Sequence, residues 1–267
     1  MLRSMYSGIS GMKNFQIKLD VIGNNIANVN TYGFKKGRTT FKDLVSQQVA
    51  GATAPTADGK GGVNPRQVGL GSALASIDTI DTQGSSMTTS RPLDLMISGD
   101  GYFMVSDGTN TYYTRAGNFY FDAAGNIVNA DGLYLTTDGK AKINIPTTGT
   151  NAVDSFSIGA NGVVTTTTGN TVATVGTINL WSFENPGGLE KIGDSLYIPS
   201  ANSGTGAQGQ PGTPGYGDIV AGALEMSNVD LSEEFTEMIV AQRGFQANTK
   251  IITTSDEILQ ELVNLKR

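Results

Sequence analysis

The chain has 267 residues, of which 38% are hydrophobic and 7% aromatic, and its formal net charge is −6. It contains no cysteine and no histidine, which excludes disulfides, thiolate metal sites and the commonest general base. Glycine is abundant, with 35 residues, and favours turns and short strands. The composition therefore argues against an enzyme, and we expect no cofactor and no metal site.

Residues 1–30 predict an amphipathic helix, because apolar side chains recur at spacings of three and four. The stripe that we expect to pack consists of Leu2, Met5, Ile9, Met12, Leu19 and Ile26, with Gln16 in the same register. A group of asparagines follows, which either ends the helix or forms amide hydrogen bonds between packed helices: Asn24, Asn25, Asn28 and Asn30. Gly33 can supply the positive φ of a terminating turn.

Residues 31–75 are expected to form an extended connector, in which the Gly-, Pro- and Ala-rich segment 50–62 is a loop. Residues 76–222 predict an all-β domain of antiparallel hairpins. Asp131-Gly132 and Asn161-Gly162 mark tight turns, and the single tryptophan, Trp181, is expected in the core. The low-complexity segment 200–217 is expected to be a loop.

Residues 223–267 predict a second long helix that begins near Asp230. Asp230 followed by Glu233 fits a capping box. The apolar stripe of this helix consists of Leu231, Phe235, Met238, Phe245, Ile252, Leu259 and Val263, with Gln242 in the same register. We therefore predict an α+β fold, in which the two terminal helices pair as a coiled coil and the β domain is inserted between them.

Charge is unevenly placed along the chain. Residues 1–42 hold seven basic side chains and one acidic, whereas residues 225–267 hold four basic and eight acidic. Opposite charges on the two helices favour pairing within or between copies. Long helices with glycine and asparagine are marginal alone, so the two stripes indicate a self-assembling protein.

Other functions have weaker support. The GxGxxG match at 204–209 has no predicted strand before it and no helix after it, so a dinucleotide site is not expected. Basic side chains near residue 36 lack stacking aromatics, so no nucleic acid is expected. No apolar run reaches 18 residues and residues 1–30 hold no secretory leader, so we expect no membrane insertion. A secreted glycan-active or glycan-binding protein is a remote alternative, with candidate carboxylates at Asp94, Asp100, Asp107 and Asp122.

Several motifs resemble those of the bacterial flagellar rod and hook proteins. The first are Ser7-Gly8-Ile9, the segment 19–30 (LDVIGNNIANVN) and Gly33-Phe34-Lys35. The carboxy-terminal motifs are the segment 224–228 (LEMSN) and Ala241-Gln242-Arg243 with Phe245 and Asn248. In the middle, residues 92–95, 99–103 and 113–119 also resemble the family. The resemblance covers nearly the whole chain and adds Arg243 and Asn248 to the signature residues.

The resemblance implies a homopolymer: a helical tube whose inner coiled-coil layer surrounds an export channel. Within the family, residues 64–71, 155–164, 229–235 and Gly244-Phe245 favour a short form of the hook protein, with the distal rod protein as the alternative. For a hook, the implied partners are the distal rod protein, the hook cap protein, the hook–filament junction protein and the flagellar export apparatus. The implied location is the flagellum, outside the cell, after export without a cleaved leader.

Overall fold

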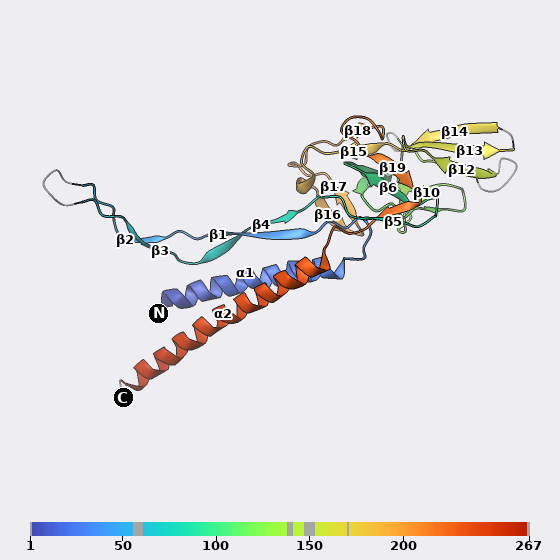
Figure 1. Cartoon of the computed structure of the whole chain (residues 1–267). Coiled ribbons are helices and arrows are strands. Elements are labelled where there is room, and N and C mark those ends of the chain that lie inside the picture. The colour runs from blue at the N-terminus through green and yellow to red at the C-terminus, as the bar shows by residue number, and fades with distance from the viewer. Residues whose placement is uncertain (1, 56–60, 138–140, 147–152, 170, 266–267) are drawn as a thin grey trace. The chain divides into compact units, whose positions relative to one another are not determined.

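The computed structural model describes residues 2–55, 61–137, 141–146, 153–169 and 171–265. The chain divides into two compact units. Unit 1 consists of residues 1–26, 37–78 and 230–267, and unit 2 consists of residues 27–36 and 79–229. Two long helices belong to the first unit and many short strands to the second (Figure 1), so the fold is α+β.

Unit 1 contains the two helices and four strands. Their bounds are α1 Leu2–Ala27, β1 Gly37–Asp43, β2 Gln47–Ala50, β3 Arg66–Val68, β4 Ser72–Thr79 and α2 Leu231–Asn264. β1 pairs with β4 and β2 with β3, so much of the expected connector is a two-stranded ribbon. The expected loop at 50–62 includes an isolated bridge between Thr53 and Val63, and its residues 56–60 lie outside the described residues.

The start of α2 follows from local chemistry. Asp230 has an extended backbone and its carboxylate accepts a hydrogen bond from the Ser232 N–H at 2.8 Å, which caps the helix as predicted. Glu233 and Glu234 lie in the first turn, where negative charge is favoured by the helix dipole. The segment before the helix differs from the expected boundary, because residues 223–225 form a strand rather than helix.

Unit 2 is built from short antiparallel strands. Their bounds are β5 Ser86–Thr88, β6 Leu95–Ser98, β7 Tyr102–Ser106, β8 Thr111–Thr114, β9 Tyr120–Phe121, β10 Ile127–Val128, β11 Tyr134–Leu135, β12 Ser155–Ile158, β13 Val163–Thr168, β14 Thr171–Thr177, β15 Leu180–Ser182, β16 Glu190–Gly193, β17 Leu196–Ile198, β18 Ala207–Gly209, β19 Asp218–Ala221 and β20 Ala223–Glu225. A short 3-10 helix, η1, covers Pro186–Gly188.

The largest sheet has the order β16-β17-β8-β7-β11-β10-β9, and β15 joins it through β7 and carries β18. β12, β13 and β14 form a second sheet, and β19 pairs with β6 while β20 pairs with β5. The predicted turns are confirmed, since Gly132 and Gly162 have φ of 81° and 75° between paired strands. The predicted loop at 200–217 is wrong in part, because β18 pairs with β15 there.

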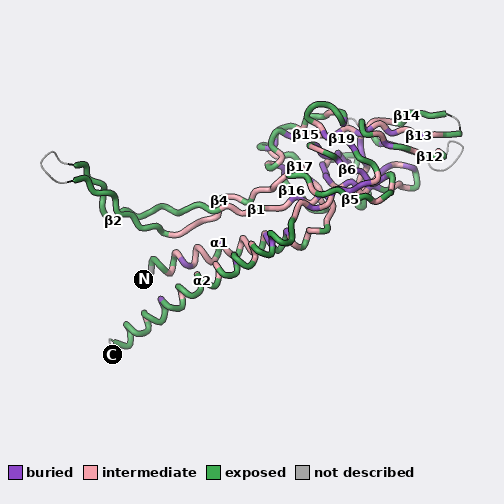
Figure 2. Tube along the Cα trace, in the orientation of Figure 1, coloured by how far each residue is buried: buried purple, intermediate pink, exposed green. Residues whose placement is uncertain are grey.

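Two hydrophobic clusters hold unit 2 together. The larger one includes Phe103, Phe119, Ile145 and Leu180, each fully buried. The smaller one is aromatic, and the partly buried Trp181 packs against it. In Figure 2 buried residues are concentrated in unit 2, whereas α2 and the strands β2 and β3 are largely exposed. Among the described residues, no helix has the length and hydropathy needed to cross a membrane.

Candidate assembly interface

The two helices of unit 1 pack against each other in antiparallel directions. Gly11 lies against Asn248, Phe15 against Gly244, Lys18 pairs with Glu237, and Asn25 bonds to Glu234. Residues later in α1 therefore contact residues earlier in α2. We call this contact the helix seam, formed by Gly8, Gly11, Phe15, Lys18 and Asn25 of α1 and by Glu234, Glu237, Gly244, Asn248 and Ile252 of α2.

Small residues allow the close approach at the seam. A Cβ on Gly244 would lie 2.5 Å from the Phe15 ring, and one on Gly11 would lie 3.0 Å from the Asn248 amide. Ala241, in the same register, is fully buried. The close intramolecular approach therefore depends on small residues that lie against larger side chains of the other helix, such as Phe15 and Ile252.

The stripes expected from the sequence are offset from this seam. About half of the expected positions follow a seam position by one residue, as Ile9 follows Gly8 and Phe235 follows Glu234. One residue rotates a side chain by about 100° around a helix. Two of the expected residues contact the other helix, since Ile252 lies against Gly8 and Met12 lies against Thr249. The packing of the other stripe residues stays a prediction.

We call the offset surface the apolar flank. Within it, Met5, Ile9, Met12, Leu19, Ile26, Met238, Phe245 and Leu259 are half-buried, while Leu231, Phe235, Val263, Gln16 and Gln242 are exposed. Ile252 is also half-buried, but it belongs to the seam. Leu2 lies in α1, and its side chain lies outside the described set. The Thr249 hydroxyl of α2 lies 3.5 Å from the Met12 sulfur of α1. The apolar flank therefore lies on the same side of both helices.

The other side of α1 carries the ribbon. The Asn14 amide donates to the Ser72 hydroxyl at 2.8 Å, and Asn14 precedes the seam residue Phe15 by one position. Asn25 exchanges two hydrogen bonds with the Gly37 backbone, at 2.9 and 3.0 Å, and also donates to Glu234. Amide bonding between packed elements, one of the two functions considered for the asparagines, is therefore what Asn25 provides.

The remaining asparagines lie at or beyond the helix end. Asn24 is exposed within α1, Asn28 accepts a hydrogen bond from the Thr31 hydroxyl, and Asn30 is exposed in the following turn. Gly33 has φ of 68°, as expected, but lies six residues past the helix end. In α2, Arg243 is exposed and the Asn248 amide donates to the Gly244 carbonyl.

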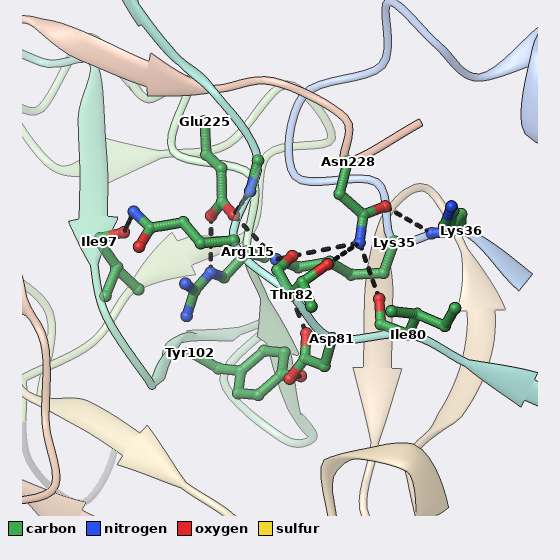
Figure 3. A network of polar contacts seen from close by, with 12 residues as sticks. Lys35, Lys36, Ile80, Asp81, Thr82, Ile97, Tyr102, Arg115, Glu225 and Asn228 are labelled. Carbon is green, nitrogen blue, oxygen red and sulfur yellow. Dashed lines mark hydrogen bonds and ion pairs between the residues drawn. The ribbon is translucent and has the colours of Figure 1, made fainter. Parts of the chain in front are cut away.

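Unit 2 contains a buried ion-pair junction that the sequence patterns do not predict. Lys35, Arg115 and Glu225 are 1%, 4% and 2% exposed. One Glu225 oxygen accepts from the Lys35 ammonium at 2.8 Å, and the other accepts from Arg115 Nε at 2.7 Å. Figure 3 shows the three side chains pointing toward one another, with Asp81 beside the Tyr102 ring.

Hydrogen bonds complete the junction. The Arg115 guanidinium donates to the carbonyls of Gly99 and Gly101, and Lys35 also donates to the Thr82 carbonyl. The Gly84 N–H donates to Glu225. Buried charges are tolerated only when paired in this way, so the junction stabilises unit 2 provided that every member is present.

Asn228 ties the neighbouring segments together. Its carbonyl oxygen accepts from the Lys36 N–H, and its amide donates to the carbonyls of Ile80 and Thr82. The Gly33 N–H donates to the Glu225 carbonyl, and a Cβ on Gly33 would lie 2.7 Å from the Arg115 backbone. Segments 33–36, 80–84, 99–115 and 225–228 thus meet in one place.

The junction determines the ionisation of its members. Burial raises the pKa of Glu225, but Arg115 and Lys35 lower it further, so the net pKa lies below the ordinary value. Burial and the nearby Asp81 raise the pKa of Tyr102, whose hydroxyl donates to Asp81 at 2.7 Å. Burial lowers the pKa of Lys191, against the attraction of Asp81.

The carboxylates considered for glycan chemistry mostly have local structural roles. Asp107 accepts hydrogen bonds from backbone N–H groups of its own turn, which lower its pKa. The pKa of Asp122 is lowered mainly by a hydrogen bond from the Asn126 side-chain amide, and further by backbone N–H groups of the same turn. Asp94 pairs with Arg91. Within the described part of the chain, no group of three or more acidic side chains could hold a metal ion.

Comparison with known proteins decides the family. Residues 5–35 match the model of the flagella basal body rod protein, residues 96–166 that of the flagellar hook protein FlgE/F/G D1 domain, and residues 220–265 that of the flagellar basal body rod FlgEFG protein C-terminal. A flagellar basal-body rod protein FlgG of Bacillus subtilis is 58% identical over the full length of both chains. This chain belongs to the flagellar rod and hook family.

Further relatives separate rod from hook. A FlgG rod protein of Caulobacter vibrioides is 40% identical over 99% of this chain, in an alignment of 270 residues. The flagellar hook protein FlgE of Borreliella burgdorferi is 32% identical, in an alignment of 442 residues that covers both chains. The comparisons therefore favour the rod alternative over the hook that the sequence motifs suggested.

The helix seam predicts opposite effects for two glycines of the helices. Gly244→Ala should destabilise the helix pair by about 1–3 kcal/mol, because the new methyl group overlaps the Phe15 ring. Gly23→Ala, where a Cβ meets nothing within 4 Å, should stabilise it by about 0.5–1 kcal/mol through helix propensity. Guanidinium-induced loss of helical circular dichroism measures both. Equal shifts for the two variants would contradict the seam.

The junction predicts an acid-sensitive contribution to stability. Glu225→Gln should cost about 3 kcal/mol, because Lys35 and Arg115 lose their shared charge partner. Since the folded pKa of Glu225 is lowered, this contribution is complete above the ordinary value of 4.5 and is lost as the pH falls through the folded pKa. Trp181 fluorescence during urea unfolding, at several pH values, reports on unit 2.

The control for this variant is Glu190→Gln, which removes an exposed carboxylate from β16 of the same unit. It should leave the urea midpoint nearly unchanged. A difference between wild type and Glu225→Gln that stays constant down to pH 2 would refute the assignment.

Proposed function

We propose that this protein is the structural subunit of the distal rod of the bacterial flagellum. The observation that carries the proposal is the 58% identity with a rod protein over the full length of both chains. The alignment with the Borreliella burgdorferi hook protein is 442 residues long, whereas this chain has 267 residues. That hook protein therefore contains long segments that this chain lacks. The hook motifs noted in the sequence are compatible with this proposal, because rod and hook proteins share a family.

The apolar flank supports self-assembly. It lies on one side of both helices and includes Phe235 and Val263, which are 50% and 66% exposed. Apolar patches of this kind mark interaction sites, and burial contributes about 25 cal/mol per Å². We infer that the flank packs against helices of neighbouring copies, so that the terminal helices form the inner coiled-coil layer of a tube.

The proposal extends to location and partners. The subunit assembles in the flagellum after export through the flagellar apparatus, and the hook protein adjoins the outer end of its polymer. The protein acts structurally and not as an enzyme. A heterologous contact that does not close, repeated from copy to copy, produces the helical tube.

Electron microscopy of purified hook–basal bodies tests the rod proposal. An affinity tag on this chain, detected with gold particles, should lie on the straight segment below the hook. The same basal bodies without the tag provide the control. Label confined to the curved segment would assign the protein to the hook and overturn the proposal.

A substitution on the flank should block assembly. Phe235→Lys should reduce the yield of sedimenting polymer by at least about tenfold, because a charge would replace an apolar contact between copies. The matched control is Ala247→Lys, an exposed position one residue before Asn248, on the side of α2 away from the flank. Helical circular dichroism should be unchanged in both variants. If Phe235→Lys polymerises as well as the control does, the flank is not the interface.

A further inference from the structure

The second sheet of unit 2 exposes an unusual strand. β14 ends the order β12-β13-β14, so in the described part of the chain one of its edges is unpaired. Residues 171–175 are all exposed, and Val172 is 72% exposed. Figure 1 shows β14 along the rim of this sheet.

Over residues 171–175, the strand itself lacks the features that normally prevent strand pairing. Proteins protect exposed edges with charged side chains, proline or a covering segment. β14 has the sequence TVATVGT, with no charge and no proline. No charged residue occurs between Asp154 and Glu184, although 16% of the chain is charged. The uncharged stretch includes all three strands of the sheet.

A hollow adjoins the same strand. Val175, Gly176 and Thr177 line a cavity of about 460 Å³, together with Thr137 and the charged Lys142 among other residues. An added strand binds by main-chain hydrogen bonds, and its alternate side chains enter neighbouring pockets. An open edge beside a hollow is the arrangement that strand addition requires.

We propose that β14 receives the β12 strand of a second copy, so that the sheet continues from one subunit to the next. This inference rests on the proposed function, since it specifies a contact between assembled copies. β12 lies at the opposite edge of the same sheet and is also uncharged, so no charge repulsion opposes contact between β12 and β14. β12 and β14 both run antiparallel to β13, so copies related mainly by translation place the two edges in parallel. The contact is heterologous and can repeat without closing.

Cysteine cross-linking in the full-length chain tests this contact, because the chain has no cysteine of its own. A variant with both Val172→Cys and Ser157→Cys, assembled and treated with a short bismaleimide, should give a ladder of covalent multimers. Both positions are exposed, and an unchanged urea midpoint by Trp181 fluorescence verifies folding. The two single-cysteine variants are the controls and should give at least tenfold less multimer.

The outcomes separate this inference from the proposed function. Polymer that sediments normally but gives no ladder overturns the strand contact and leaves the rod proposal standing. Dimers from Val172→Cys alone would show a self-paired β14 and also overturn the contact. If the unsubstituted chain forms no polymer and gold label is absent from the rod, the proposed function fails and the strand contact fails with it.

Discussion

The β unit depends on one carboxylate shared by two buried cations. Glu225 pairs with Lys35 and Arg115 at the same time, and each of the three side chains is almost completely buried. Asp81, 3.7 Å from the Lys35 ammonium, supplies a second negative charge. Charges in such an environment are costly unless each has a partner. The arrangement joins a segment near the start of the chain, a strand end in the middle and a strand near the carboxy-terminal helix. Unit 2 is thus closed by residues that are up to 190 positions apart.

The helix pair follows a different principle. Within one molecule, glycines pack against larger side chains such as Phe15 and Ile252, and part of the apolar surface lies beside this contact. The two helices pack closely through the seam, and the apolar flank takes little part in this contact. A helix pair of this kind is folded and still retains apolar surface for other copies, which is the property that a polymer subunit needs.

Much of the architecture was predictable from local signals. The two helices, the Asp230 cap and the hairpin turns at Gly132 and Gly162 follow from periodicity, capping and turn chemistry. The ribbon was missed because strands without buried neighbours carry no regular apolar alternation. The glycine contacts of the seam could not be predicted, because apolar periodicity reports large side chains, whereas a contact such as Gly244 with Phe15 leaves no hydrophobic pattern. The junction was missed although Lys35, Arg115 and Glu225 all lie in the motifs that indicated the family. Their pairing is a long-range property, which no local pattern reveals.

The position of Glu225 has a consequence for how the protein is delivered. If the chain emerges amino-terminus first from a narrow conduit, Lys35 and Arg115 appear long before their common partner. Until residue 225 follows, the two cations remain hydrated and the β strands cannot close around them at low cost. On the export route proposed above, premature folding at the exit would therefore be disfavoured, and the subunit would acquire its final form only when almost the whole polypeptide had passed through.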